Sequence, residues 1–491
     1  MKNLCLVTIV MAIIATGITH AQTDLRWMQT YGGQTAEVGA GAQQTSDGGY
    51  IIAGRTDSFG SGGDDVYLVR TDANGQEVWS KTFGGTGDDT ANSVQVTTDG
   101  GYIIAGRTES FGAGGNDVYL IKADSDGNKI WSRTFGGTKD DRAYDVKQTT
   151  DGGYVIVGTT YSFGAGVSDV YQIKTDANGI ETWSEYHGGI NGDHGRKVLQ
   201  TSDGGYAIVG TTYSFGPRND NVYLVKTDDV GFKTWHQTYG GDSIDKGFDI
   251  QPTLDGGHVI VGHTVTSAPG PWDVYLIKLD ALWVNTWTRT FGGSGYDEGH
   301  SVMQTSDGGY IIAGRTDSFG AGDNDLYLIK TDADGIESWS QTSGRHLDDG
   351  AYEILLTSGG GYTIVGDTES YGAGNKDAWL IRLAEPDFDL DYGPKPVMPG
   401  QWMLFRITQA APNRSSWIAC SLSGFGCQTL PILNVTMGID SPRTLLGPKT
   451  TDSQGQCDFP LFVPPGASGV TVWIQAVQHS LSSDIEEISI Q

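Results

Sequence analysis

Cysteine is almost absent from this 491-residue chain, whose four cysteines are Cys5, Cys420, Cys427 and Cys457. No disulfide therefore stabilises the long region between the first and the second of them. The three cysteines near the C-terminus allow one bridge and one free thiol. Cys420 and Cys427 flank the turn-forming stretch Ser-Leu-Ser-Gly-Phe-Gly, so we expect these two to pair. A zinc site is disfavoured because the chain has no C-x-x-C motif.

Basic residues are also scarce. Lysine and arginine together number 31, against 59 aspartates and glutamates, and the net charge is −28. A surface this acidic repels nucleic acid and anionic membranes, so we exclude both as partners. The carboxylates provide solubility, and they also suit cation binding.

Long apolar runs are missing beyond the N-terminus. Lys2 precedes an apolar run from Leu4 to Ile14, and Thr19-His20-Ala21 is a small-residue cleavage site. This pattern predicts a secretory signal peptide over residues 1–21 that is removed near Ala21. No later stretch reaches the ~20 apolar residues that span a bilayer. We therefore expect a protein that is secreted or held at the cell surface, with no membrane insertion.

Three common catalytic motifs are missing from the chain, namely G-x-S-x-G, H-E-x-x-H and G-x-x-x-x-G-K. They mark a nucleophilic serine, a catalytic zinc and a phosphate-binding loop. Adjacent carboxylates such as Asp88 and Asp89 are abundant. Neighbours in sequence do not establish the opposed pair of carboxylates that a glycosidase requires. The sequence thus favours a non-catalytic protein.

The chain does contain a 52-residue repeat. An Asp-Gly-Gly step recurs at this spacing and begins at Asp47, Asp99, Asp151, Asp203, Asp255 and Asp307. In the seventh copy, Gly359 stands in place of the aspartate. Tryptophan recurs at the same spacing, at Trp27, Trp79, Trp131, Trp183, Trp235, Trp287 and Trp339. Such periodicity indicates an architecture in which each unit is covered by its neighbours.

The sixth copy of the repeat shows how one unit is expected to fold. Its sequence predicts four strands, over residues 301–305, 310–313, 326–330 and 337–342. Asp307-Gly308-Gly309 is a tight turn, because Asp-Gly and Gly-Gly tolerate positive φ. Gly314, which has a glycine counterpart in every copy, indicates a close backbone approach or a bend. Four strands joined by short turns at this period predict propeller blades, in preference to a stacked β-solenoid.

The two ends of the repeat region predict a closed ring. The seventh copy lacks a tryptophan-bearing fourth strand, whereas Leu25 to Gly33 aligns with Glu77 to Gly85. In a ring, the N-terminal strand completes the last blade and removes a free edge. We therefore predict that residues 24–33 pair with Ala378 to Leu383. The predicted fold class is all-β: a seven-bladed β-propeller closed by an N-terminal strand, followed by a small C-terminal β-sandwich domain.

The elements DGGYIIAG-x-T and D-x-Y-L-I-K resemble the repeats of exported bacterial seven-bladed β-propeller proteins. The resemblance extends from about residue 24 to about residue 384. It implies a propeller fold and an exported or surface protein, and it supplies no catalytic residues. Propellers serve as enzymes, lectins, adhesins and scaffolds, so the function has to be argued from the site.

The chain divides by composition into four predicted parts. They are the signal peptide, the propeller, a proline-rich linker and the β-sandwich domain, over residues 1–21, 22–384, 385–400 and 401–491. Within the linker, Asp387, Asp389 and Asp391 stand at alternate positions, which suits Ca²⁺. Tyr392 stands where an EF-hand loop needs glycine, so a calcium site and a solvated linker are both open. Ca²⁺ is the one cofactor that the sequence suggests.

Two acidic positions recur on the face opposite the Asp-Gly-Gly turns, where propellers usually hold ligands. One position precedes each inner strand, at Glu37, Asp89, Asp141, Asp193, Asp245, Asp297 and Asp349. The other precedes each third strand, at Asp65, Asp117, Asp169, Asn221, Asp273, Asp325 and Asp377. A carboxylate repeated in every blade is typical of a cap on backbone N–H groups. A ring of carboxylates that binds cations at the channel mouth is the alternative.

Departures from the repeat on the same face identify candidate ligand-binding residues. The fifth copy carries Trp272 in its loop, and the fourth carries Arg218. The links before the fourth and sixth inner strands add His187, His194, Arg196, Tyr296 and His300. A tryptophan near such polar groups suits a sugar, which stacks on an aromatic face and bonds to a polar rim. Packing of Trp272 on the next blade is the alternative.

We therefore expect an exported, monomeric, non-catalytic propeller that binds a glycan or a surface protein through its variable loop face. One alternative is a carbohydrate-active hydrolase or lyase that uses the histidines and acids of copies four to six. A purely structural surface scaffold is the other. A panel of polysaccharides separates the three, since an enzyme releases products, a lectin retains its glycan intact and a scaffold does neither.

Overall fold

The computed structural model describes residues 25–217, 220–265, 271–358 and 360–384 with their side chains, and the backbone of 390–392, 402–408, 415–422, 427–429, 471–477 and 483–489. Within this part of the chain, no helix is long and apolar enough to cross a membrane. Thr23–Glu385 forms one compact unit, and Pro386–Gln491 belongs to a second. The predicted signal peptide, Arg218, Asp387 and Asp389 lie outside the described residues, as does the side chain of Asp391.

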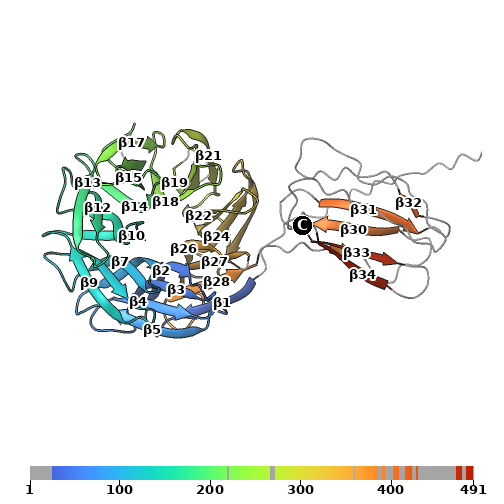
Figure 1. Cartoon of the computed structure of the whole chain (residues 1–491), viewed down its shortest axis with the longest axis horizontal. Helices are drawn as coiled ribbons and strands as arrows, with labels where there is room; N and C mark the ends of the chain where they lie inside the picture. The colour runs from blue at the N-terminus through green and yellow to red at the C-terminus, as the bar shows by residue number, and fades with distance from the viewer. Residues whose placement is uncertain are drawn as a thin grey trace, which may run out of the picture. The chain divides into compact units, whose positions relative to one another are not determined.

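Seven four-stranded antiparallel sheets make up the first unit, and Figure 1 shows them as blades around a common axis. The innermost strands are β2 (Glu37–Gln44), β6 (Asp89–Val96), β10 (Asp141–Gln148), β14 (Asp193–Gln200), β18 (Asp245–Pro252), β22 (Asp297–Gln304) and β26 (Asp349–Leu356). The second strands are β3 (Tyr50–Thr56), β7 (Tyr102–Thr108), β11 (Tyr154–Thr160), β15 (Tyr206–Thr212), β19 (His258–Thr264), β23 (Tyr310–Thr316) and β27 (Tyr362–Thr368).

The outer half of each blade follows the same order. The third strands are β4 (Asp65–Thr71), β8 (Asp117–Ala123), β12 (Asp169–Thr175), β16 (Asn221–Thr227), β20 (Asp273–Leu279), β24 (Asp325–Thr331) and β28 (Asp377–Leu383). The outermost strands are β5 (Glu77–Phe83), β9 (Lys129–Phe135), β13 (Glu181–His187), β17 (Lys233–Tyr239), β21 (Asn285–Phe291), β25 (Glu337–Ser343) and, in the seventh blade, β1 (Leu25–Tyr31). We number the blades one to seven from β2.

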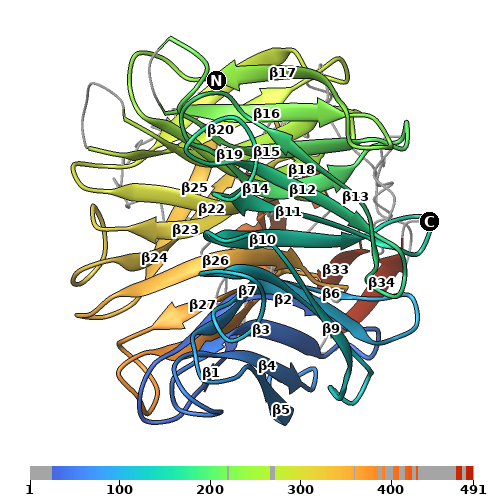
Figure 2. The same cartoon turned by 90° about the vertical axis from the view of Figure 1, so that its left-hand side faces the viewer.

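The apolar core lies between neighbouring blades. Ile51 and Leu68 of blade one pack in one cluster with Tyr102 and Ile104 of blade two. Six further clusters each join two adjacent blades in the same way. In the side view of Figure 2, strands of adjacent blades such as β10 and β14 lie side by side. Because each blade is covered on both faces, its second and third strands are continuous apolar runs without alternation.

The repeated glycine of the second strand is required by a bulge in the first. In blade one the pairing register shifts between Gly39 and Gly41. A Cβ atom at Gly54 would lie 1.7 Å from the carbonyl oxygen of Val38. The same shift occurs in the other six blades, which confirms the predicted close backbone approach. The bulged residue of each inner strand has no cross-strand partner, so its side chain is re-aimed.

The N-terminal strand closes the ring, as the offset of the repeats predicts. β1 pairs antiparallel with β28, from Leu25 opposite Leu383 to Tyr31 opposite Ala378. Trp27 meets Tyr50 of blade one edge-on, with ring centroids 5.9 Å apart. Trp79 and Tyr102 repeat this contact at 6.0 Å. Trp27 is therefore packed like an internal repeat tryptophan, and the seven-bladed propeller is confirmed.

The second unit is described by its backbone alone. β29 (Leu390–Tyr392), β30 (Trp402–Thr408), β31 (Ser415–Leu422) and β32 (Cys427–Thr429) form an antiparallel sheet, and β33 (Thr471–Val477) pairs with β34 (Ser483–Ser489). Cys427 lies opposite Leu422, and Cys420 opposite Thr429. The β-sandwich and the disulfide stay predictions.

Candidate functional site

The two repeated acidic positions cap backbone groups at the loop face. Asp89 accepts hydrogen bonds from the backbone N–H of Gly85 at 2.8 Å and from Ser110 Oγ at 2.6 Å. Asp117 accepts one from the N–H of Ala113 at 2.9 Å. Both side chains are buried, and the acids that precede the other inner strands form matching bonds. In the part of the chain that the structure describes, no three His, Cys, Asp or Glu side chains are grouped to hold a metal ion. These bonds support the capping interpretation.

His187 lies in a different place from the link in which the sequence analysis put it. It is the last residue of β13 and only 3% exposed. Its Nε2 lies 2.9 Å from Oε1 of Gln172 on β12. These two residues stand where blade one has Phe83 and Leu68, so a polar pair replaces an apolar one. His187 is therefore a core residue, out of reach of a ligand on the loop face.

Trp272 packs against its own blade and the link that follows. Its ring is parallel to that of His263, with centroids 4.6 Å apart, and it meets Tyr296 edge-on at 4.9 Å. One face of the indole is therefore covered by His263, while Tyr296 remains 46% exposed. His300 lies in the channel wall, where its Nδ1 is 2.7 Å from the carbonyl oxygen of Ala351.

The structure brings two of the predicted site residues, His194 and Arg196, into one cavity. Both belong to the inner strand β14, where the sequence analysis expected a link, and Arg196 is the bulged residue. The cavity has a volume of about 180 Å³ and lies at the loop-face end of the inner strands of blades three to five. It is lined by Arg142, Tyr144, Thr159, Tyr161, His194, Arg196, Thr211, Tyr213 and Lys246.

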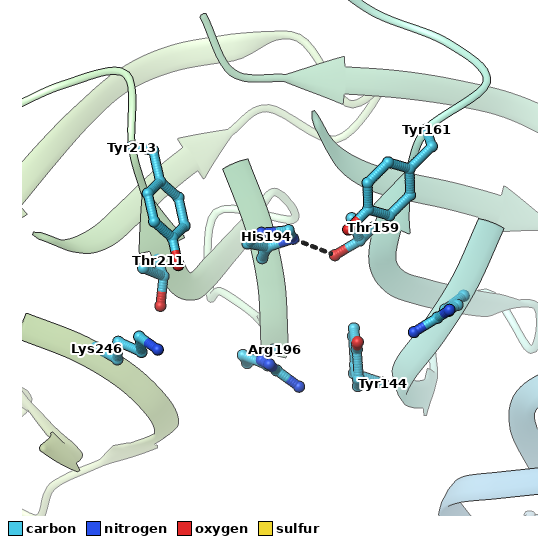
Figure 3. Close-up of a pocket in the computed structure, with 9 residues that line it drawn as sticks. Tyr144, Thr159, Tyr161, His194, Arg196, Thr211, Tyr213 and Lys246 are labelled. Carbon is cyan, nitrogen blue, oxygen red and sulfur yellow. Dashed lines mark hydrogen bonds between the residues drawn. The ribbon is translucent and has the colours of Figure 1, made fainter. Parts of the chain in front are cut away.

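Figure 3 shows His194 at the centre of this lining, between Tyr161 and Tyr213. Its ring centroid is 6.5 Å from that of Tyr161 and 5.8 Å from that of Tyr213. Its Nδ1 lies 3.2 Å from Thr159 Oγ1. Burial, followed by the charge of Arg196, lowers the pKa of His194 to about 4, so this ring is neutral at pH 7. The upper wall of the cavity is thus aromatic and hydroxyl-bearing.

Three basic side chains, Arg142, Arg196 and Lys246, line the rest of the cavity. The guanidinium of Arg196 lies over the ring of Tyr144, 4.1 Å from its centroid, which fixes the cation in place. Arg142 pairs with Asp140 at 3.0 Å. Among the described residues, the Nε of Arg196 has no hydrogen-bond partner, and no ion pair involves Lys246. In Figure 3, Arg196 and Lys246 both lie below His194 in the lining of the cavity. This lining offers donors and positive charge to an anion.

A charged contact lies beneath the cavity, one residue further along the inner strands. Lys197 Nζ is 3.3 Å from Glu353 Oε1 of blade seven and 3.9 Å from Asp145 of blade three. Burial opposes the charge of Lys197, but Asp145 and Glu353 raise its pKa above the ordinary value. Lys197 therefore stays charged, and it reaches across the ring to blade seven. The cavity thus lies at the mouth of the channel, and these charged side chains lie below it.

A second polar cluster borders the cavity on the side of blades five and six. Arg315 approaches Glu298 at 2.9 Å, and His300 Nε2 does so at 3.0 Å. Burial alone would raise the pKa of Glu298, but these partners hold it well below its usual range. Lys246 Nζ lies 5.9 Å from the ring centre of Trp272. The lysine thus connects the cavity with the Trp272–Tyr296 surface.

Alignment of the seven copies along the inner strand would have identified the cavity. The second residue of that strand is Val38, Thr90, Arg142, His194, Lys246, Glu298 or Gly350. The fourth, bulged residue is Ala40, Asn92, Tyr144, Arg196, Phe248, His300 or Tyr352. These positions vary in chemistry far more than the apolar strands around them. The loops and links that depart from the repeat indicate only two of the lining residues, His194 and Arg196.

Comparison with known proteins leaves the family open. No protein-family model matches the chain. The regulatory protein FlaEY of Caulobacter vibrioides is 25% identical over 202 residues, which cover 36% of this chain and 20% of that protein. The chain thus spans about a fifth of the length of this relative.

Solved structures with similarity to the chain include three with low scores. The Pan2 WD40 domain of Neurospora crassa has a TM-score of 0.44 at 12% identity, covering 72% of this chain and 97% of that one. Sqt1 of Chaetomium thermophilum has a TM-score of 0.41 at 11% identity, and the match covers 81% of this chain and 97% of that one. BamB of Moraxella catarrhalis has a TM-score of 0.36 at 11% identity, and the match covers 72% of this chain and 85% of that one. The strand pairing within the seven sheets, closed by β1 against β28, defines the propeller.

Proposed function

We propose that this chain is an exported, non-catalytic binding protein that holds a carboxylate-bearing glycan in the cavity of blades three to five. The observation that carries the proposal is the convergence of Arg142, Arg196 and Lys246 with Tyr161 and Tyr213. Arginine and lysine give charge-assisted hydrogen bonds to a carboxylate. The tyrosines supply aromatic surface and hydroxyl groups, which suit a sugar ring.

The charge of the whole chain makes this cavity selective. The net charge of −28 repels anions from the surface in general. The three cations of the cavity therefore attract an anion to this one site, while the rest of the surface repels it. The cavity has a volume of about 180 Å³, which suits a single sugar residue.

Trp272 and Tyr296 extend the proposed site beyond Lys246. The half-covered indole and the exposed phenol ring offer aromatic surface to a second, neutral sugar residue. This arrangement retains the sugar-binding role that the sequence analysis assigned to Trp272, with the cavity as the principal site.

A carbohydrate panel tests the proposal. Calorimetric titration of the full chain with D-glucuronate, D-galacturonate, glucose and galactose should give binding of the uronates alone. Incubation with the corresponding polysaccharides should leave them intact. Release of fragments would favour the hydrolase or lyase alternative, and equal binding of neutral and acidic sugars would contradict the role of the cations. Selective binding of an acidic peptide would favour a protein partner instead.

A further inference from the structure

The residue that follows the second strand occupies one structural position in all seven blades. In each blade its N–H donates to the carbonyl oxygen of the residue before the inner strand, as Tyr161 does to Asp140 at 2.9 Å and Asp57 does to Ala36 at 2.9 Å. The seven residues are Asp57, Glu109, Tyr161, Tyr213, Val265, Asp317 and Glu369. This position therefore forms a ring of side chains around the channel mouth.

The chemistry of this ring changes sharply between blades. Blades three to five carry Tyr161, Tyr213 and Val265, whereas the other four blades carry a carboxylate. The cations Arg142 and Lys246, with His194 between them, occupy the adjoining inner-strand position in those same three blades. The mouth thus has a cationic, aromatic sector over blades three to five and an acidic sector over blades six, seven, one and two.

The acidic sector remains negative after its own ion pairs are counted. Asp57, Glu109 and Asp317 are exposed. Glu369 pairs with Lys376 at 3.3 Å. Two nearby arginines are paired as well, Arg55 with Asp64 and Arg315 with Glu298. Arg107 donates to Thr90 Oγ1 at 3.3 Å, and the three exposed carboxylates outnumber this one cation. Two further carboxylates border the cationic sector, namely Asp140, which pairs with Arg142, and Asp220, which lies near Lys246.

We infer that the cavity recognises a single terminal carboxylate sugar on an otherwise neutral glycan, and that Asp57, Glu109 and Asp317 exclude polyuronates. This inference rests on the proposed function. The cavity accepts one anionic residue, and Lys197 and Glu353 occupy the channel beneath it. A second and third carboxylate on the same chain would lie over like charges, which repel them. Neutral residues meet no such repulsion, and Tyr296 offers them an aromatic surface.

Three probes test the inference on the full chain by calorimetry at low salt. They are D-glucuronate, 3′-sialyllactose, which bears one terminal carboxylate sugar on a neutral disaccharide, and a galacturonate pentamer. We expect 3′-sialyllactose to bind at least as tightly as glucuronate and the pentamer to bind at least about tenfold more weakly than either. Tighter binding of the pentamer would overturn the inference and leave the proposed function standing. Failure of every carboxylate sugar to bind would overturn both.

A matched variant separates exclusion from simple lack of fit. The triple substitution Asp57→Asn, Glu109→Gln and Asp317→Asn keeps the acceptor oxygens that Asn116 Nδ2 and the Tyr296 N–H use. We expect the affinity for the pentamer to rise at least about tenfold, and that for glucuronate to change less than about twofold. An unchanged affinity for the pentamer would show that these carboxylates do not set the specificity.

Discussion

Lys197 Nζ of blade four lies 3.3 Å from Glu353 Oε1 of blade seven, a contact between residues 156 positions apart. Glu353 also accepts a hydrogen bond from the N–H of Ala42 at 2.7 Å, so this one carboxylate joins three blades. Asp145 of blade three likewise joins the two adjacent blades. It accepts a hydrogen bond from Ser93 Oγ of blade two at 2.9 Å and another from the N–H of Val198 of blade four at 3.1 Å. Charged side chains thus bind the inner strands together in the channel.

Removal of Lys197 should therefore destabilise the ring. Lys197→Met leaves Asp145 and Glu353 without their shared cation, and breaking a buried ion pair costs ~3–5 kcal/mol. Urea unfolding followed by tryptophan fluorescence measures the loss. The double variant Lys197→Met/Glu353→Gln should recover part of it, because one uncompensated charge is then removed. A loss no larger than that of the exposed Lys129→Met would show that the contact contributes little.

The pair of His187 and Gln172 should make stability depend on pH. Burial, with a smaller contribution from Lys233, lowers the pKa of His187 to about 4. Histidine in an unfolded chain has a pKa of ~6.5, so the unfolded chain takes up the proton first as pH falls. The contribution that the buried, neutral His187 makes to the free energy of unfolding is fully present above about pH 6.5. It is lost as the pH falls towards 4.

The double variant His187→Phe/Gln172→Leu restores the apolar pair of blade one and should reduce this loss. Between pH 7 and pH 4.5 it should lose less free energy of unfolding than the wild type, by up to ~3 kcal/mol. Thermal or urea unfolding at the two pH values makes the comparison. Equal losses in both proteins would mean that His187 is not the source of the pH dependence.

Trp272→Ala should separate the two parts of the proposed site. The melting temperature should fall by a few degrees, because the indole stacks on His263 and meets Tyr296. Binding of glucuronate in the cavity should stay within about twofold, whereas 3′-sialyllactose should bind about tenfold more weakly, because aromatic contacts contribute ~0.5–1.5 kcal/mol. If both ligands bind as before, Trp272 is a packing residue only.

The architecture of the ring was predictable from the sequence, and the site was predictable only in part. The spacing of Trp27 and Asp47 from their counterparts encodes seven blades, and the missing last strand encodes the closure by β1. The cavity depends on Arg196, a bulged residue whose direction no sequence pattern specifies, and on side chains from three blades. His187 was misplaced because its link begins one residue later, after a strand that ends in the core. Trp272 was placed at the loop face, but its packing on His263 depends on the folded blade.

Deletion of residues 25–33 should open the ring. The strand pairs with β28 over its whole length, and Trp27 packs on Tyr50 of blade one. The truncated chain should expose a sheet edge and aggregate, as light scattering would show. Truncation after residue 384 serves as the control and should leave the propeller folded, because the pairing of β1 with β28 uses no later residue. A chain without β1 that melts like the full protein would contradict the role of this strand.

The central claim is that Arg196 and Lys246 hold the carboxylate of a sugar, and one titration tests it most directly. Arg196→Met/Lys246→Met keeps the aliphatic stems, and Arg55→Met/Arg107→Met removes two mouth arginines from blades outside the cavity as a control. Calorimetry with D-glucuronate should show binding weakened at least ~100-fold in the first variant, because charged hydrogen bonds contribute ~1.5–3 kcal/mol each. The control should bind within about threefold of the wild type, with both melting temperatures preserved. Equal weakening in the two variants, or unchanged affinity in the first, would contradict the site.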